Sequence, residues 1–366
     1  MHSFTNAKQL TGMIVCVALL FACQPDKQTG LNEKELLGKQ LFFDENLSEP
    51  AGQSCATCHT AEKGFADIYS RVTSEGAVKG RFSNRNSMTS AYACYVPPLH
   101  YSDEDETYVG GLFWDGRVNT LEEQAAQPFT NPLEMGNNDN EMVSEKVRRA
   151  GYYQDLVKIY GEPVSNDSLF SYITNAIAAY ERSAEMNPFT SKYDAWEAGK
   201  CELTAQEQLG LELFKEKGLC AECHILEPDE RAGKVLFTDH TYDNLGIPSN
   251  PDNPFFTTPA PYNPCGRDTV DMGLGSTLKD IAEAGKFRVP TLRNITLTAP
   301  YGHNGYFNTL EEIIHFYNVR DVEEYPQPEF AATVNKDELG NLGLTPEEEA
   351  AIIAFLSTLT DGYRAD

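Results

Sequence analysis

Apolar residues recur at helical spacing in two segments of the chain, and each segment leads into a short motif with two cysteines. The first segment, residues 33–43, reads Glu-Lys-Glu-Leu-Leu-Gly-Lys-Gln-Leu-Phe-Phe, and the second, residues 206–214, reads Gln-Glu-Gln-Leu-Gly-Leu-Glu-Leu-Phe. Apolar residues three and four positions apart lie on one face of a helix. Both segments are therefore predicted to be helices with one buried face.

Each half of the chain also closes with a predicted helix. Residues 168–180 carry apolar side chains at helical spacing. Residues 345–356 begin with Thr345, Pro346 and Glu348, which form a capping box with proline at the first helical position. Because the same order of elements occurs twice, with equal spacing between the matching cysteines, we infer an internal duplication of one supersecondary unit.

The cysteine motif in each half is Cys-x-x-Cys-His. This is the attachment signature of c-type haem, in which two thiols bond to the vinyl groups and the histidine binds the iron. A zinc half-site or a redox dithiol is the alternative, but no second Cys-x-x-Cys pair lies close enough to complete a zinc site. We predict two covalently attached haem c groups, held by Cys55, Cys58, His59, Cys220, Cys223 and His224.

These patterns predict an all-α protein with two cytochrome c-like haem domains, related by internal duplication and joined by long irregular loops. We expect the first domain at residues 33–190 and the second at 191–366, because a helical pattern breaks down within residues 184–203. Residues 93–111 and 227–271 are rich in loop-forming residues. Long irregular loops in compact domains usually have a function, and here we expect them to wrap the haems.

The first residues read as a targeting segment. An apolar run at residues 13–22 is too short for a transmembrane helix, and it is followed by Cys23 in a pattern that resembles a bacterial lipoprotein box. We expect residues 1–22 to be a signal peptide and residues 23–32 to be a tether with Cys23 lipidated. The protein would then lie in the periplasm, with a lipid as its only membrane anchor. An ordinary signal peptide cut nearby is the alternative.

The composition is strongly acidic. The 366 residues include 55 acidic and 29 basic side chains, for a formal net charge of −26. Such a surface repels nucleic acid and anionic lipid headgroups, and it steers a basic protein partner. No long apolar run follows residue 30, so the mature chain is expected to be soluble.

Three cysteines remain after those of the haem motifs and the leader are set aside. They are Cys94, Cys201 and Cys265, among nine cysteines in all. An odd number allows at most one disulfide within the chain. The sequence leaves open which two would pair.

Further segments bring the chain close to a known family. It resembles the bacterial di-haem cytochrome c peroxidases and the related di-haem oxidase that matures methylamine dehydrogenase. Besides both Cys-x-x-Cys-His motifs, the resemblance rests on residues 37–43, Arg85, Asn86, residues 113–117, Gln124, Pro128, Glu134, Met135, residues 289–294 and residues 299–305.

This resemblance implies a division of labour between the two haems. The N-terminal haem would cleave hydrogen peroxide, and the C-terminal haem would accept electrons from a small cytochrome c or a cupredoxin. Trp114 matches a tryptophan that lies between the haems and passes electrons. Gln124 and Glu134 match two residues of the distal peroxide pocket.

The resemblance also implies a calcium ion between the domains. Its ligands would be the Asn86 side chain and the backbone carbonyls of Thr298 and Pro300. His303 lies in the same loop, and we expect it to serve in hydrogen bonding rather than catalysis. Family members often dimerise, so a homodimer is a further expectation.

Glu134 is the candidate for moving the peroxide proton. It lies in Pro-Leu-Glu-Met, and such apolar surroundings raise the pKa of a carboxyl group, so that it can accept and donate a proton near neutral pH. Taken alone it would read as one of many solvated acids. Gln124 would orient peroxide through a hydrogen bond.

The sixth iron ligands define the subtype. Many family members have a distal histidine at the N-terminal haem, which would fall near residues 76–79, but no histidine lies between His59 and His100. We predict an open distal site there, with His100 as the alternative ligand. At the C-terminal haem the methionine of many relatives is replaced by Tyr317, and Met272 is the alternative ligand.

Three functions follow from these residues. The first is a cytochrome c peroxidase that reduces hydrogen peroxide to water. The second is a di-haem oxidase that modifies side chains of a partner protein, and the third is a pure electron-transfer cytochrome. Glu134 and Gln124 beside an open haem face argue against the third. Peroxidase is the first prediction because it needs no dedicated protein substrate.

Overall fold

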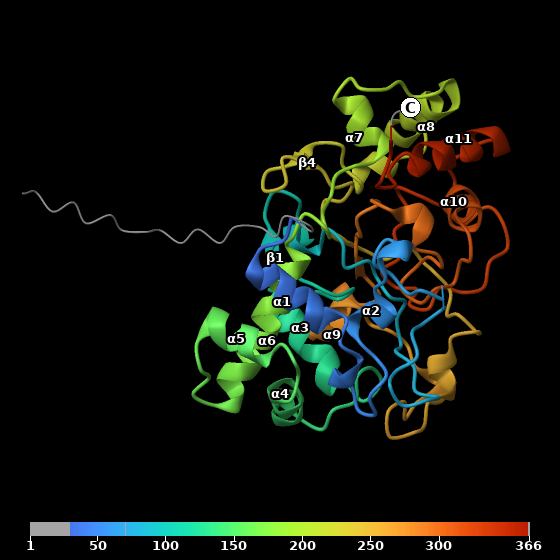
Figure 1. Cartoon of the computed structure of the whole chain (residues 1–366). Coiled ribbons are helices and arrows are strands. Elements are labelled where there is room, and N and C mark those ends of the chain that lie inside the picture. Colours follow the sequence, from blue (N-terminus) through green and yellow to red (C-terminus); the bar gives the residue numbers. More distant parts are fainter. Residues whose placement is uncertain (1–29, 70, 365–366) are drawn as a thin grey trace, which may run out of the picture.

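The computed structural model describes residues 30–69 and 71–364, and helices dominate it (Figure 1). The predicted all-α class is confirmed, since the sheets are three isolated two-stranded pairs. The helices are α1 (Glu33–Phe42), α2 (Cys55–Cys58), α3 (Leu121–Thr130), α4 (Asn140–Arg148), α5 (Tyr153–Tyr160), α6 (Asn166–Glu181), α7 (Lys192–Glu197), α8 (Ala205–Lys215), α9 (Leu274–Leu278), α10 (Leu310–Val319) and α11 (Pro346–Ser357). The strands are β1 (His100–Ser102), β2 (Thr107–Val109), β3 (Pro228–Asp229), β4 (Lys234–Val235), β5 (Tyr242–Asp243) and β6 (Phe287–Arg288).

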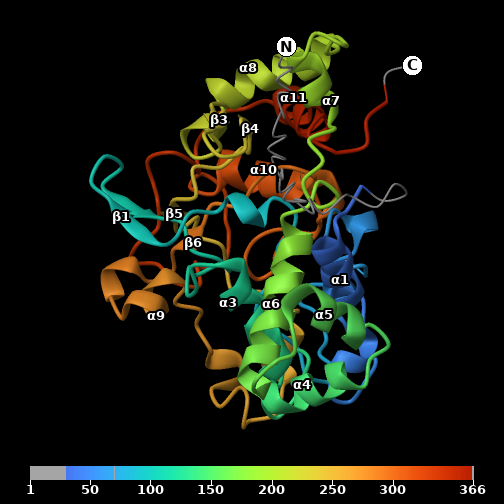
Figure 2. The same ribbon diagram turned by 60° about the vertical axis from the view of Figure 1, so that its left-hand side comes forward.

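The same helix crossing occurs twice. In the first half α1 packs against α6, and in the second half α8 packs against α11, as both views show (Figures 1 and 2). A Cβ atom on Gly38 of α1 would overlap the carbonyl oxygen of Ala176 in α6. A Cβ atom on Gly210 of α8 would overlap the carbonyl of Ala351 in α11 in the same way. The duplication read from the cysteine spacing therefore extends to how the helices pack.

The predicted ends of these helices follow from their caps. Thr345 caps α11 through a reciprocal capping box with Glu348, and proline occupies the first turn. Asn32 and Glu35 form the same kind of box at the start of α1. Each cap satisfies backbone N–H groups that have no partner within the helix, which defines where the helix begins.

The hydrophobic core falls mainly into two clusters, one around each helix pair. The first includes Phe42, Phe129 and Ile173, and the second includes Phe214 and Phe355. All five side chains are almost completely buried. Each cluster surrounds one of the Cys-x-x-Cys-His motifs, so each haem site is built into a separate part of the core.

The loop-rich segments contain short strands that the sequence did not predict. Residues 93–111 include the antiparallel pair of β1 with β2. In the second half β5 pairs with β6, which brings Tyr242 opposite Arg288. The N–H of Arg288 also donates to the carbonyl of Trp114, at 2.9 Å. The β5–β6 pair of the second half therefore lies next to the segment of the first half that holds Trp114.

Several predictions concern residues that the structure does not describe. The signal peptide, Cys23 and most of the tether lie outside the described residues. Within residues 30–69 and 71–364, no helix has the length and apolar character that a membrane crossing requires. Over the same residues Cys94, Cys201 and Cys265 are all free thiols.

Candidate di-haem active site

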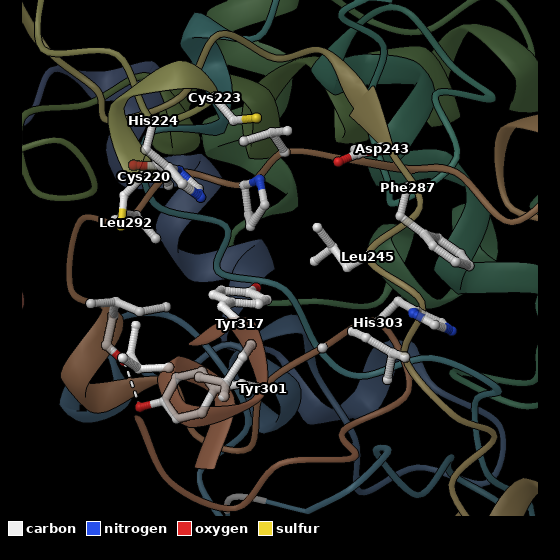
Figure 3. A pocket seen from close by; sticks show the side chains of 18 of the residues that line it. Cys220, Cys223, His224, Asp243, Leu245, Phe287, Leu292, Tyr301, His303 and Tyr317 are labelled. Atoms are coloured by element: carbon white, nitrogen blue, oxygen red, sulfur yellow. Dashed lines mark hydrogen bonds between the residues drawn. The ribbon is translucent and has the colours of Figure 1, made fainter. Parts of the chain in front are cut away.

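Two large cavities contain the two cysteine motifs. The first cavity is lined by Cys55, Cys58 and His59 and has a volume of about 1540 Å³. The second is lined by Cys220, Cys223 and His224 and has a volume of about 1530 Å³ (Figure 3). Each is large enough for a macrocycle attached through its two cysteines.

The histidine of each motif is held in the orientation that an iron ligand needs. Nδ1 of His59 lies 3.0 Å from the carbonyl oxygen of Phe65, and Nδ1 of His224 lies 2.8 Å from that of Phe237. Both phenylalanines have left-handed backbone conformations, with φ of 59° and 56°. A hydrogen bond from Nδ1–H to a carbonyl fixes the tautomer that leaves Nε2 free for a metal.

Burial also keeps these histidines neutral. It lowers the pKa of His59, and it lowers the pKa of His224 to about 4. A neutral imidazole is the form that binds iron. The local structure of both motifs therefore suits the proximal role that the sequence predicts.

Arg288 and His240 supply polar groups that match the acidic edge of a haem. Arg288 lines both cavities and is buried, yet it forms no ion pair with any carboxylate in the described part of the chain. Nε2 of the buried His240 has no hydrogen-bond partner, and its Nδ1 lies 3.5 Å from Nη1 of Arg288. A buried cation and an unpaired donor are costly unless an anion reaches them. A haem propionate is such an anion, so the donor set fits the cofactor.

The first cavity also brings together the predicted peroxide residues. Gln124 and Pro128 lie one helical turn apart on α3, and both line the cavity. Glu134 lines it from the loop that follows α3. Burial raises the pKa of Glu134, although the nearby Arg117 acts in the opposite direction. A carboxyl with a raised pKa that lines the same cavity as an amide can move a proton near neutral pH.

The segment where relatives carry a distal histidine packs behind Glu134. The N–H of Ala77 donates to the carbonyl of Glu134 at 2.7 Å, and Gly76 lies directly against the carbonyl of Leu133. None of residues 76–79 lines the first cavity. His100 is exposed on β1, bonds to the carbonyl of Pro98, and does not line the cavity either. The structure thus brings neither segment to the distal side.

Trp114 lies between the two cavities and lines both of them. Its indole N–H donates to the carbonyl of Asn86 at 2.9 Å, which fixes the ring. The ring of Phe287 packs edge-on against it, with centroids 6.5 Å apart. An aromatic ring held at this position suits the predicted electron path.

Tyr317 extends from α10 into the second cavity, across from His224 (Figure 3). Burial raises the pKa of its hydroxyl above the ordinary value. A bound ferric ion has the opposite effect on an oxygen ligand, because its charge favours the phenolate. Met272 does not line this cavity, and its carbonyl accepts hydrogen bonds from Gly275 and Gly285. The structure therefore places Tyr317, and not Met272, on the wall of this cavity, and the ligand assignment stays a prediction.

The three residues predicted to bind calcium lie on the wall of the second cavity. Asn86, Thr298 and Pro300 all line it. The backbone N–H of Asn86 donates to the carbonyl of His303 at 2.8 Å. His303 in turn bonds through Nε2 to Glu329, at 3.0 Å, so its role in hydrogen bonding is to a carboxylate of the chain. The calcium site itself stays a prediction.

The sequence reasoning missed three residues that line the first cavity, namely Glu181, His240 and Arg288. His240 and Arg288 come from the second half of the chain, and only the fold brings them there. Glu181 could have been found from the sequence, because the matching position in the closing helix of the second half is an apolar residue, Leu356.

The chain has two c-type haem motifs in duplicated helical units, and Trp114 lies between them. A carboxyl group and an amide line the first cavity. These features define the class of di-haem cytochrome enzymes. Comparisons with known proteins agree with this class. Residues 32–202 match the family described as di-haem cytochrome c peroxidase. The methylamine utilization protein MauG of Paracoccus denitrificans is 36% identical over 350 residues, which covers 89% of this chain and 88% of that protein.

Two further relatives extend this result. The cytochrome-c peroxidase IdrP1 of Denitromonas iodatirespirans is 30% identical, over 90% of this chain and 81% of its own. The crystal structure of the diheme peroxidase BthA from Burkholderia thailandensis has a TM-score of 0.78 at 32% identity, over 93% of this chain and 87% of its own. The chain belongs to the di-haem cytochrome c peroxidase family, which includes proteins named as peroxidases and proteins named MauG.

Proposed function

We propose that this protein is a cytochrome c peroxidase that reduces hydrogen peroxide to water. The observation that carries the proposal is that Gln124 and Glu134, whose pKa is raised, both line the first cavity. Residues 76–79 contain no histidine and do not line that wall, and His100 does not line it either. A carboxyl and an amide beside an accessible haem face have a use in peroxide chemistry and none in simple electron transfer.

The chain's own residues would manage the proton. The bound haems supply the iron and the electrons for breaking the O–O bond. Glu134 accepts the proton from one peroxide oxygen and returns it to the other, which leaves as water. Gln124 donates a hydrogen bond that orients the peroxide. Two electrons and two further protons complete the conversion of one peroxide to two waters.

The electrons would enter at the second haem. A small donor protein, a cytochrome c or a cupredoxin, would deliver them one at a time, and the acidic surface of this chain would favour a basic donor face. Trp114 is the proposed route to the first haem, supported by its position on both cavity walls. We also propose that the protein is exported to the periplasm and lipidated at Cys23. It would bind a calcium ion with Asn86 among the ligands, and it would form a homodimer.

A specific observation favours a second candidate function. Tyr317, rather than a methionine, faces His224 across the second cavity. Phenolate is an anionic ligand that favours ferric iron, so it opposes electron acceptance at the second haem. The similarity to MauG points in the same direction. In this alternative the haem pair would oxidise side chains of a partner protein.

Steady-state peroxide consumption by the purified holoprotein, with a reduced small cytochrome c as donor, tests the proposal. Multiple turnovers per second are expected for a peroxidase, in line with ordinary enzyme rates of about 1–10³ s⁻¹. Oxidation of the protein by peroxide without donor turnover would favour the oxidase. If neither haem reacts with peroxide, both functions are rejected.

A further inference from the structure

Glu181 is a buried carboxyl that the proposed peroxide chemistry does not use. It is the last residue of α6, its exposed fraction is 4%, and it lines the first cavity. Its Oε2 atom has no hydrogen-bond partner. The neighbouring Arg182 forms its ion pair with Glu122 instead, at 2.8 Å. Among residues 30–69 and 71–364, Glu181 therefore has no ion-pair partner.

The second half of the molecule shows what the fold itself requires at this position. Gly38 packs against Ala176 and Tyr180 of α6, and Gly210 packs against Ala351 and Phe355 of α11. The residue that follows Tyr180 is Glu181, and the residue that follows Phe355 is Leu356.

Leu356 lines the second cavity as Glu181 lines the first, and its exposed fraction is 3%. A leucine thus satisfies the packing at this position of the duplicated unit. Replacing it by a carboxyl without a partner costs free energy, because a buried polar group without a hydrogen bond loses its interactions with water. The Glu181 carboxyl is not needed for stability and lines the cavity of the first haem. Such a group suggests a role in the chemistry of that haem.

Burial keeps the proton of Glu181 in place near neutral pH. Burial raises its pKa to about 8, Glu122 on α3 acts in the same direction, and Arg182 on its own helix acts against it. The other ionisable groups that sense it are the thiols of Cys55 and Cys94. In the holoprotein Cys55 is a thioether and has no charge.

We propose that Glu181 balances the charge of the first haem by exchanging one proton with solvent for each electron that this haem exchanges. When the first iron loses an electron, Glu181 loses its proton to water in the cavity, and the buried charge stays constant. When the iron regains the electron, Glu181 takes a proton back. This inference rests on the proposed function only in assigning reactive chemistry to the first haem.

The sign of the effect follows from linkage. A carboxylate stabilises the oxidised iron more than the reduced iron, so oxidation lowers the pKa of Glu181 and deprotonation lowers the reduction potential. The potential of the first haem should therefore fall as pH rises through the pKa of Glu181. The second haem has Leu356 at the matching position and should lack this contribution.

Spectroelectrochemical titration of the holoprotein between about pH 6 and pH 9.5 tests the inference, a window that brackets the pKa range of a buried carboxyl. Glu181→Gln keeps the size of the side chain, and Glu181→Leu copies the second half. Both variants should lose part of the pH dependence at the first haem and keep a higher potential at alkaline pH. Equal slopes in wild type and both variants would overturn the inference.

The control is Glu185→Gln, because Glu185 is a nearby carboxylate that pairs with Lys39 and does not line the cavity. It should keep the wild-type slope. The absorption spectrum of the first haem checks that each variant has folded around its cofactor. Peroxide turnover measured on the same samples keeps the two proposals apart. If the Glu181 variants lose the pH dependence of the first haem's potential but the wild type does not turn over peroxide, only the proposed function is rejected. If the wild type turns over peroxide normally but the variants keep its pH dependence, only the role of Glu181 is rejected.

Discussion

Two carboxyl groups on one cavity wall differ in what surrounds them. Glu134 and Glu181 both line the first cavity, and burial raises the pKa of each. Glu134 has Asn131 and Ser83 as hydrogen-bonding neighbours and the positive Arg117 nearby. Glu181 has only Arg182, which already pairs with Glu122. Because their surroundings differ, the two acids can have separate roles. We propose that Glu134 moves the peroxide proton and that Glu181 balances the charge of the first haem.

The first prediction at this scale concerns Glu134. Glu134→Gln removes the proton carrier and keeps the shape, so peroxide turnover should fall by about 10²–10⁴-fold while both haems stay attached. Steady-state kinetics and the absorption spectrum measure the two effects. Glu145→Gln on α4 changes an exposed carboxylate and should leave turnover unchanged. Full activity in Glu134→Gln would remove this residue from the mechanism.

The second concerns the ligand of the second haem. Tyr317→Phe removes the hydroxyl that faces His224 but keeps the ring, so the optical and electron paramagnetic resonance spectra of the second haem should change. Met272→Leu should change neither spectrum, because Met272 lies outside that cavity. The reverse result would make Met272 the ligand.

At the scale of elements, the helix pairs define the positions of both haem sites. α1 with α6 and α8 with α11 form the same close crossing, and each pair supplies residues to its own cavity. The glycines at the crossings allow the helix backbones to approach closely. Sequence periodicity predicted all four helices. It did not predict α4, α5 or the β1–β2 pair, because short elements in polar segments depend on contacts with distant residues.

Substitution of the crossing glycines should be destabilising. Gly38→Ala and Gly210→Ala place a Cβ atom onto a backbone carbonyl of the partner helix, so each should cost about 1–3 kcal/mol of the free energy of unfolding, as overpacking does. Chemical denaturation followed by circular dichroism measures the loss. Gly151→Ala is the matched control, since nothing lies within 4 Å of the added atom. A wild-type midpoint for both crossing variants would contradict the crossing geometry.

At the scale of the whole molecule, one largely buried group of ion pairs joins the two halves beside Trp114. Arg85 bonds to Asp271 through Nε at 2.6 Å and to Asp115 through Nη1 at 2.7 Å. Asp115 follows Trp114 in the chain, and Asp271 lies in the second half. The group therefore ties the segment that holds Trp114 to both halves.

This ion-pair group predicts a pH-dependent stability. Arg85 lowers the pKa of Asp271 to about 2, so the stabilisation is complete above the ordinary value of about 4 and is lost as pH falls towards 2. Asp271→Asn leaves Arg85 with Asp115 as its remaining partner and should cost about 2–3 kcal/mol at neutral pH, with a smaller loss in acid. Thermal unfolding across pH measures both, and the exposed Asp268→Asn should behave as wild type. A pH-independent loss would contradict the assignment.

The amino-acid sequence by itself determined the covalent chemistry and the repeat. Two cysteines and a histidine within one helical turn define a haem attachment site, and capping boxes and helical periodicity define helix ends, because all of these depend on residues close together in the chain. It also singled out Glu134, Gln124, Trp114 and Tyr317 through resemblance to a family. The structure alone decided which groups face each other. Arg288 and His240 reach the first cavity from the second half, and Glu181 has no ion-pair partner in the part of the chain that the structure describes. Burial and pairing of this kind arise only when distant segments pack together.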